Sequence, residues 1–150
     1  MHSFLANLPP KSVVLLHAGC HNPSGADLNR KQWSILAELF LAKQLIPFID
    51  AAYLGFDISF EEDAFPIRLF AGLGLEFLTA VSFSKNFSLY GERVGLLMVF
   101  SSESATINIL SQLRVLARRT YSNPPLHGAK IVGKVLQEPN LVLQWQKELT

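Results

Sequence analysis

The chain has 150 residues, 49% of them apolar and 17% charged, with 13 basic and 12 acidic side chains and a formal net charge of +1. This composition predicts one folded domain, and the even charge balance argues against a nucleic-acid or anionic-membrane partner. No apolar run reaches the ~18 residues that span a bilayer, so we expect a soluble protein of the cytoplasm, with the mitochondrion as the alternative.

Short apolar runs alternate with amphipathic segments along the first half of the chain. Residues 12–19, rich in valine and leucine between two prolines and a turn-rich segment, predict a buried strand. Residues 29–44 place apolar side chains at helical spacing, which predicts a helix. A second apolar run at 45–53 predicts another buried strand, and a helix is expected over 63–74, where Pro66 is tolerated in the first turn.

The second half continues the pattern. Residues 76–84 and 94–101 predict two more buried strands, residues 102–120 a long helix with Ser102 or Ser104 as N-cap, and residues 129–150 further helix. Apolar strands alternating with amphipathic helices indicate an α/β sheet covered by helices on both faces. Ligands of such sheets bind beyond the carboxyl ends of the strands. The polar residues at or just after predicted strand ends are His17, Asn22, Asp50, Tyr53, Ser82, Ser84 and Lys85.

Taken singly, each of these residues has an ordinary structural role, because an acid that closes a strand often caps the next helix and a lysine there is usually solvated. Together they indicate a site. A lysine repels a cation and no His or Cys cluster has ligand spacing, so a metal site is disfavoured. The chain also lacks a G-x-S-x-G nucleophile elbow and a glycine-rich phosphate loop.

The combination fits an aldehyde cofactor held as a lysine imine. Pyridoxal phosphate requires a lysine for the Schiff base, an acid that keeps the pyridine nitrogen protonated, and hydroxyl and guanidinium groups for the phosphate. Lys85, Asp50, Ser82 and Arg93 could supply these groups in turn.

Five motifs carry a resemblance to a known family: HNPSG at 21–25, FIDAAYLGF at 48–56, EEDAF at 61–65, SFSKNFSLYGERVG at 82–95 and YSNPPLHGA at 121–129. In order and spacing they resemble the class I pyridoxal-phosphate-dependent aminotransferases, more narrowly the aspartate and aromatic amino acid branch. The resemblance runs from about Ser12 to Thr150. It implies the core of the family's large domain, a partial three-layer α/β sandwich with a mostly parallel sheet.

The resemblance also implies roles for individual residues. Lys85 would carry the cofactor and then move the proton at the substrate α-carbon, and Asp50 would pair with the pyridinium nitrogen. Tyr53 and Asn22 would hydrogen-bond the phenolic oxygen of pyridoxal phosphate and so lower the pKa of the imine. Asn22 would also contact substrate, and the Asn22–Pro23 peptide is typically cis in this family.

Arg93 and Ser82 match the family's phosphate ligands, with Ser84 beside them at the cofactor. Arg118 matches an arginine that reaches into the neighbouring subunit and pairs with a substrate carboxylate. The adjacent Arg119 is the alternative match for this arginine. His17 would lie behind the cofactor, and Tyr90 matches the family without an assigned role. Three mild departures from the family pattern are Ser24 for threonine, Ser88 for glycine and Gly91 for asparagine.

The resemblance implies that residues 1–150 form a single fragment of the large domain, with the family's N-terminal segment and small C-terminal domain outside it. Two functions follow. The first is transamination between an L-amino acid (aspartate, another dicarboxylic or an aromatic one) and a 2-oxo acid, by a homodimer in the full-length form. The alternative is a non-catalytic fragment that acts as a dimerisation or binding module.

Overall fold

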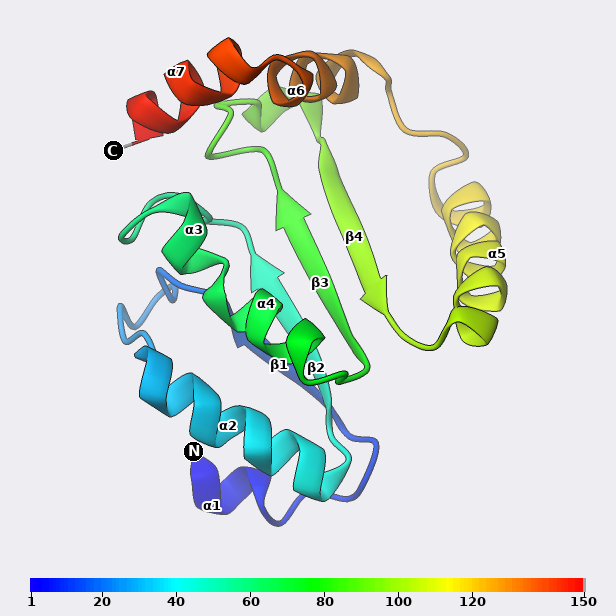
Figure 1. Cartoon of the computed structure of the whole chain (residues 1–150). Helices are drawn as coiled ribbons and strands as arrows, with labels where there is room; N and C mark the ends of the chain where they lie inside the picture. Colours follow the sequence, from blue (N-terminus) through cyan, green and yellow to red (C-terminus); the bar gives the residue numbers. More distant parts are fainter. Residues whose placement is uncertain (150) are drawn as a thin grey trace.

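The structure is a computed structural model that describes residues 1–149, with four strands in one mixed sheet and helices packed around it (Figure 1). In sheet order the strands are β1 (Val13–His17), β2 (Ile46–Ala51), β3 (Phe77–Ser82) and β4 (Gly95–Phe100). Strands β1, β2 and β3 are parallel, and β4 is antiparallel to β3. The predicted α/β class with a mostly parallel sheet is therefore confirmed.

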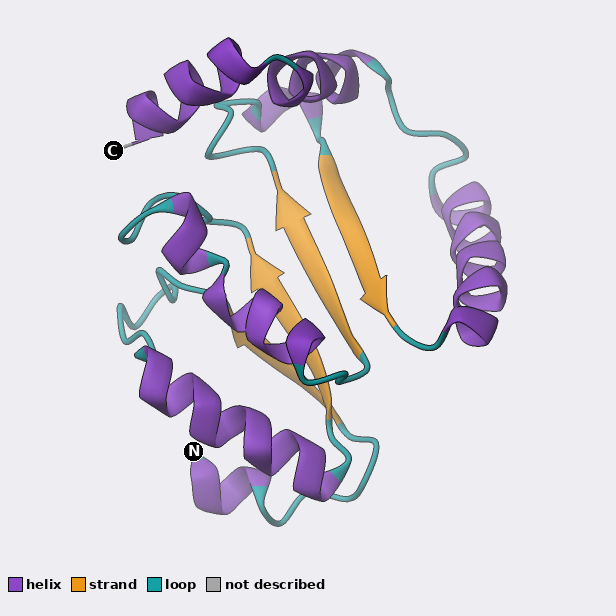
Figure 2. Cartoon of the chain, viewed as in Figure 1, coloured by secondary structure: helices purple, strands orange, loops and turns teal. Residues whose placement is uncertain are grey.

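Helices occupy most of the remaining chain. They are α1 (His2–Leu5), α2 (Arg30–Lys43), α3 (Phe60–Asp63), α4 (Phe65–Gly72), α5 (Glu103–Thr120), α6 (His127–Gln137) and α7 (Pro139–Leu149), with a 3-10 turn, η1, at Tyr90–Glu92. Figure 2 shows α2 and α4 side by side along one face of the sheet. Within residues 1–149, no helix is long and apolar enough to cross a membrane. The cytoplasmic location stays a prediction.

Helix α2 begins at a reciprocal cap. The Asn29 side chain accepts the backbone N–H of Gln32 at 2.9 Å, and the Gln32 side chain accepts the backbone N–H of Asn29 at 2.9 Å. This capping box satisfies two N–H groups that the first turn leaves without a helical partner. The helix then directs Trp33 and Phe40 toward the sheet, as the helical spacing predicts.

An aromatic cluster joins α2 and α4 to the sheet. The Phe70 ring lies 5.9 Å from both Trp33 and Phe40 and 5.8 Å from Phe77, measured between centroids. Phe77 in turn stacks on Phe100 of β4 at 4.1 Å. Phe40, Phe70 and Phe77 are at most 1% exposed, so each contributes about 2–3 kcal/mol of burial free energy. This cluster packs α2 and α4 against β3 and, through Phe100, against β4.

The opposite face of the sheet is more open than the sequence predicts. Side chains alternate between faces along a strand, and Val13 and Leu15 of β1 point away from α2 with 61% and 63% of their surface exposed. Leu97 of β4, which the strand register places on the same face as Leu15, is also exposed. β1 and β4 are the outer strands of this sheet, so the prediction that both are buried holds only in part.

The predicted helix over 63–74 is two helices. α3 ends at Asp63, and α4 begins after Ala64, with Pro66 in its first turn as expected. Asp63 therefore closes one helix instead of opening the next. α1 was not expected from the sequence, and Ser102 occupies the N-cap position of α5 without a side-chain hydrogen bond to the helix.

Candidate functional site

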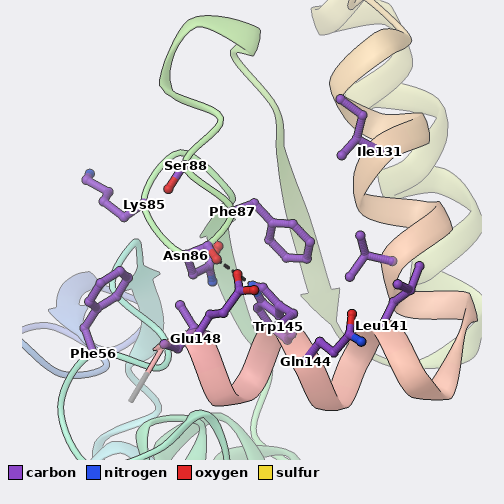
Figure 3. Close-up of a pocket in the computed structure, with 12 residues that line it drawn as sticks. Phe56, Lys85, Asn86, Phe87, Ser88, Ile131, Leu141, Gln144, Trp145 and Glu148 are labelled. Atoms are coloured by element: carbon purple, nitrogen blue, oxygen red, sulfur yellow. Dashed lines mark hydrogen bonds between the residues drawn. The ribbon is translucent and has the colours of Figure 1, made fainter.

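Lys85 lies immediately beyond the carboxyl end of β3, as predicted. Its ammonium nitrogen is 4.6 Å from the centroid of the Tyr53 ring, which follows the carboxyl end of the neighbouring strand β2. Among residues 1–149, the Lys85 amine forms no hydrogen bond or ion pair, and it lies over the face of the Tyr53 ring instead. Figure 3 shows Lys85 directed away from α7, at the rim of a cavity of about 500 Å³.

Tyr53 connects the lysine to the loop after β1. The Asn22 side-chain amide donates to the Tyr53 hydroxyl at 3.4 Å, and the Asn22–Pro23 peptide is cis, as the sequence resemblance implies. Three of the predicted site residues, Lys85, Tyr53 and Asn22, are therefore brought into one chain of contacts. They come from three different loops, all at the carboxyl edge of the parallel strands.

Asp50 lies in β2, three positions before Tyr53, and is half-buried. One carboxylate oxygen accepts the backbone N–H of Ala52 at 3.0 Å, and the other accepts no hydrogen bond among the described residues. His17 pairs with Asp50 across the β1–β2 ladder, and its ring lies 4.6 Å from that of His21. Asp50, with one carboxylate oxygen that accepts no hydrogen bond within residues 1–149, therefore lies opposite His17 at the carboxyl edge of the parallel strands.

Ser82 and Ser84 lie just before the lysine in the chain, and Arg93 follows it by eight positions. The Ser82 hydroxyl accepts the backbone N–H of Ser84 at 3.2 Å, and Ser84 is buried. Arg93 donates one guanidinium N–H to the Tyr90 carbonyl at 3.0 Å and is otherwise exposed. The backbone of Arg93 has φ +52°, an unusual left-handed conformation for an arginine, directly after η1.

Arg118 lies apart from this cluster. It is in the last turn of α5 and donates to the Ser122 hydroxyl at 2.6 Å. Figure 1 places α5 on the outer side of β4, whereas α3 and the loop after β2 lie at the other side of the sheet. An arginine that serves a neighbouring subunit has no need to contact its own subunit's lysine, so the predicted role stays a prediction.

A buried acid that the sequence prediction missed shapes the loop after β2. The Asp63 carboxylate accepts backbone N–H groups from Gly55 at 2.7 Å, Asp57 at 3.2 Å, Ile58 at 3.1 Å and Ser59 at 3.4 Å, and it is 6% exposed. Asp63 belongs to the EEDAF motif at 61–65, but the motif alone predicts no role for it. The carboxylate organises the chain that follows Tyr53.

Replacing Asp63 with Asn should destabilise this loop. The amide presents an N–H₂ where a carboxylate oxygen accepted backbone N–H groups, so we expect the free energy of unfolding to fall by about 2–3 kcal/mol. Urea denaturation of the 150-residue chain measures this. The control is Glu61→Gln, which removes an exposed ion pair with Arg68 and should cost less than about 1 kcal/mol. Equal losses in the two variants would contradict the role of Asp63.

Two other kinds of site are disfavoured. Burial, together with the negative charges of Asp57, Asp27 and Asp63, raises the pKa of the Cys20 thiol, which keeps it protonated and a poor nucleophile. Among residues 1–149, no group of three or more His, Cys, Asp or Glu side chains could hold a metal ion. The lysine cluster is thus the candidate site.

Comparison with known proteins decides the family. The sequence profile described as "Aminotransferase class I and II" matches residues 1–150. The chain belongs to the class I and II aminotransferase family. The aspartate aminotransferase of Pseudomonas aeruginosa is 50% identical to it over 143 residues, 95% of this chain and 36% of the relative. The aromatic-amino-acid aminotransferase of Escherichia coli is 49% identical over 146 residues, 97% of this chain and 37% of the relative.

Solved structures agree with this assignment. A crystal structure of the aromatic-amino-acid aminotransferase from Burkholderia pseudomallei, covalently bound to pyridoxal phosphate, superposes with a TM-score of 0.96 at 48% identity, over 99% of this chain and 38% of that one. The resemblance inferred from the motifs is therefore confirmed. This aminotransferase chain spans less than two fifths of the length of these relatives.

Proposed function

We propose that this aminotransferase chain forms the cofactor-binding part of an enzyme that exchanges amino groups between an L-amino acid and a 2-oxo acid. The contact of Lys85 with Tyr53, whose hydroxyl meets Asn22, carries the proposal. It joins an amine, a phenol and an amide at the carboxyl edge of the parallel strands, where ligands of such sheets bind.

The donor set suits pyridoxal phosphate. The Lys85 amine is unpaired among the described residues, Asp50 has one carboxylate oxygen without a hydrogen bond, and Arg93 uses one guanidinium N–H for a backbone carbonyl. These are the amine, acid and phosphate-binding fork that the cofactor requires. When bound, pyridoxal phosphate supplies an aldehyde and an electron-withdrawing ring.

The chain's own groups then have distinct tasks. Asp50 would hold the proton of the pyridine nitrogen, and Tyr53 and Asn22 would donate hydrogen bonds to the phenolic oxygen. Ser82 and Arg93 hold the phosphate, with Ser84 behind them. Lys85 would hold the cofactor through its amine and would also be the general base for the proton of the substrate α-carbon, because an amine held in place at the site is an efficient general base.

We also propose a preference for dicarboxylic substrates, which rests on Arg118. The hydrogen bond to Ser122 links this arginine to the segment that carries the YSNPP motif. The proposed assembly is a homodimer in which Arg118 pairs with the side-chain carboxylate of a substrate in the partner's site. A guanidinium gives such a carboxylate a bidentate partner, which favours aspartate over an apolar amino acid.

A chimera tests this preference. In it, residues 1–150 replace the matching segment of the Pseudomonas aeruginosa aspartate aminotransferase; below it is called the chimera. Arg118→Gln should lower kcat/KM for aspartate about 100-fold, because a buried carboxylate loses its partner, while kcat/KM for an apolar amino acid changes little. Arg119→Gln is the matched control. Equal losses for both substrates, or a larger loss of aspartate turnover in Arg119→Gln, would overturn the assignment to Arg118.

A second candidate function is favoured by the exposed apolar surface. Val13 and Leu15 of β1 are 61% and 63% exposed, and Ile107 of α5 is 73% exposed. Apolar side chains gathered on open surfaces often mark contacts with other chains. In this alternative the 150-residue chain is a non-catalytic association module. Sedimentation velocity that shows self-association, combined with no attachment of pyridoxal phosphate to Lys85, would favour it.

A further inference from the structure

The segment after Lys85 is held from two sides through Asn86. The Asn86 side-chain amide donates to the Leu54 carbonyl at 3.2 Å, directly after Tyr53 in the chain. The Asn86 backbone carbonyl accepts the indole N–H of Trp145 in α7 at 2.5 Å. Asn86 is 3% exposed, so both hydrogen bonds are shielded from water.

Trp145 also packs against two aromatic rings, one on the lysine segment and one at the start of α3. It stacks on Phe87 with centroids 4.6 Å apart and meets Phe60 edge-on at 5.3 Å. Figure 3 shows Phe87 and Trp145 side by side, with Trp145 bonded to Asn86 and Lys85 directed away from them. Phe87 belongs to the lysine segment, and Phe60 follows the loop that carries Tyr53. One indole therefore contacts the lysine segment and the first residue of α3, the helix that follows the Tyr53 loop.

A second contact packs α7 against the loop that follows Tyr53. A methyl group added at Gly55 would lie 2.8 Å from the Leu149 side chain, and Gly55 has φ +95°. This φ angle favours glycine, and the Leu149 side chain of α7 occupies the space where a Cβ would lie. The last turns of α7 therefore lie directly on the segment between Tyr53 and Phe60.

We propose that Trp145 is a positioning residue for Lys85. It clamps the lysine segment, through the Asn86 carbonyl and the Phe87 ring, to the loop that carries Tyr53, and so fixes the direction of the lysine side chain. This inference rests on the proposed function of Lys85. It adds that α7, which contributes no residue to the cofactor contacts, determines how well the lysine is placed to capture pyridoxal phosphate.

The test uses the 150-residue chain and two readouts. Trp145→Phe keeps an aromatic ring for stacking but removes the N–H donor. Without cofactor, amide hydrogen exchange in residues 84–89 should become about tenfold faster, because a buried carbonyl loses its partner. With pyridoxal phosphate added, capture by Lys85 should slow about tenfold, and the cofactor band should lose circular dichroism per bound cofactor. Leu143→Ala, an exposed position on α7, should leave both readouts at their wild-type values.

Unchanged exchange in residues 84–89, or wild-type capture and dichroism despite faster exchange, would overturn the proposal. If Trp145→Phe loses its helical circular dichroism, Phe87→Leu replaces it, since that variant keeps the indole hydrogen bond and removes only the stacked ring. Faster exchange in both 84–89 and 141–149 would then support the clamp, and faster exchange in 141–149 alone would overturn it. Failure of the wild-type chain to attach the cofactor at Lys85 contradicts the proposed function, whereas the exchange experiment still tests the clamp.

Discussion

Replacing Lys85 with Ala is expected to lower aspartate turnover by the chimera about 10⁴-fold. The alanine removes the amine that attaches the cofactor and, with it, the base that takes the α-proton of the substrate; a positioned acid or base alone contributes up to about that factor. In the structure no other amine contacts Tyr53 among the described residues, so no neighbour can replace it. Coupled spectrophotometric assay of 2-oxo acid formation measures the loss.

Lys31→Ala is the matched control for this experiment. Lys31 lies on an exposed position of α2, away from the carboxyl edge of the sheet, and turnover should stay within experimental error of the parent chimera. Added methylamine, which can enter the space left by the lysine side chain, should restore part of the Lys85→Ala activity. A Lys85→Ala chimera that retains wild-type turnover would contradict the role of this lysine.

The second large effect is expected for Asp50→Asn. The asparagine keeps the size of the side chain and an acceptor for the Ala52 N–H, but it cannot hold a proton at the pyridine nitrogen. Asp50 acts through the pyridine nitrogen, whose proton lets the ring draw off the negative charge that develops at the α-carbon. Loss of one such electrostatic group typically costs about 10²–10³-fold, and we expect kcat of the chimera to fall by about that factor. Cofactor affinity should fall less than kcat, because the lysine and the phosphate ligands remain.

Asp57→Asn separates this effect from a general loss of negative charge. Asp57 is an exposed acid in the loop that follows β2, and its side chain lies outside the Lys85–Tyr53–Asn22 contacts. The variant should keep kcat within about threefold, as for surface substitutions generally. A comparable loss of kcat in the two asparagine variants would contradict the role of Asp50 at the pyridine nitrogen.

Much of this arrangement could be predicted because strand ends are easy to locate. Runs of valine, leucine and isoleucine mark β1, β2 and β3, and parallel strands bring their carboxyl ends to one edge, so residues just after those runs converge. Lys85, Tyr53 and Asn22 were found in this way, and the structure joins them. Helical periodicity likewise located α2 and the aromatic face that it buries.

Other features depend on contacts that local patterns do not encode. The pattern predicts a helix that begins at Asp63, whereas the Asp63 carboxylate holds a loop up to eight residues earlier. For Trp145 the pattern predicts only a place in a helix, whereas its indole N–H donates to the backbone carbonyl of Asn86, 59 positions away. Strand burial was overestimated for β1, since an apolar run does not reveal which face has a covering layer.

The most direct test of the central claim is to find where the cofactor attaches. The 150-residue chain is incubated with pyridoxal phosphate, treated with borohydride to make any lysine linkage permanent, digested and mapped by mass spectrometry, alongside Lys85→Ala. We predict that the peptide carrying Lys85 gains the added mass earlier in the incubation than any other lysine peptide does. This adduct should be absent from Lys85→Ala. Labelling spread evenly over surface lysines, with the same pattern in Lys85→Ala, would contradict the assignment of this site.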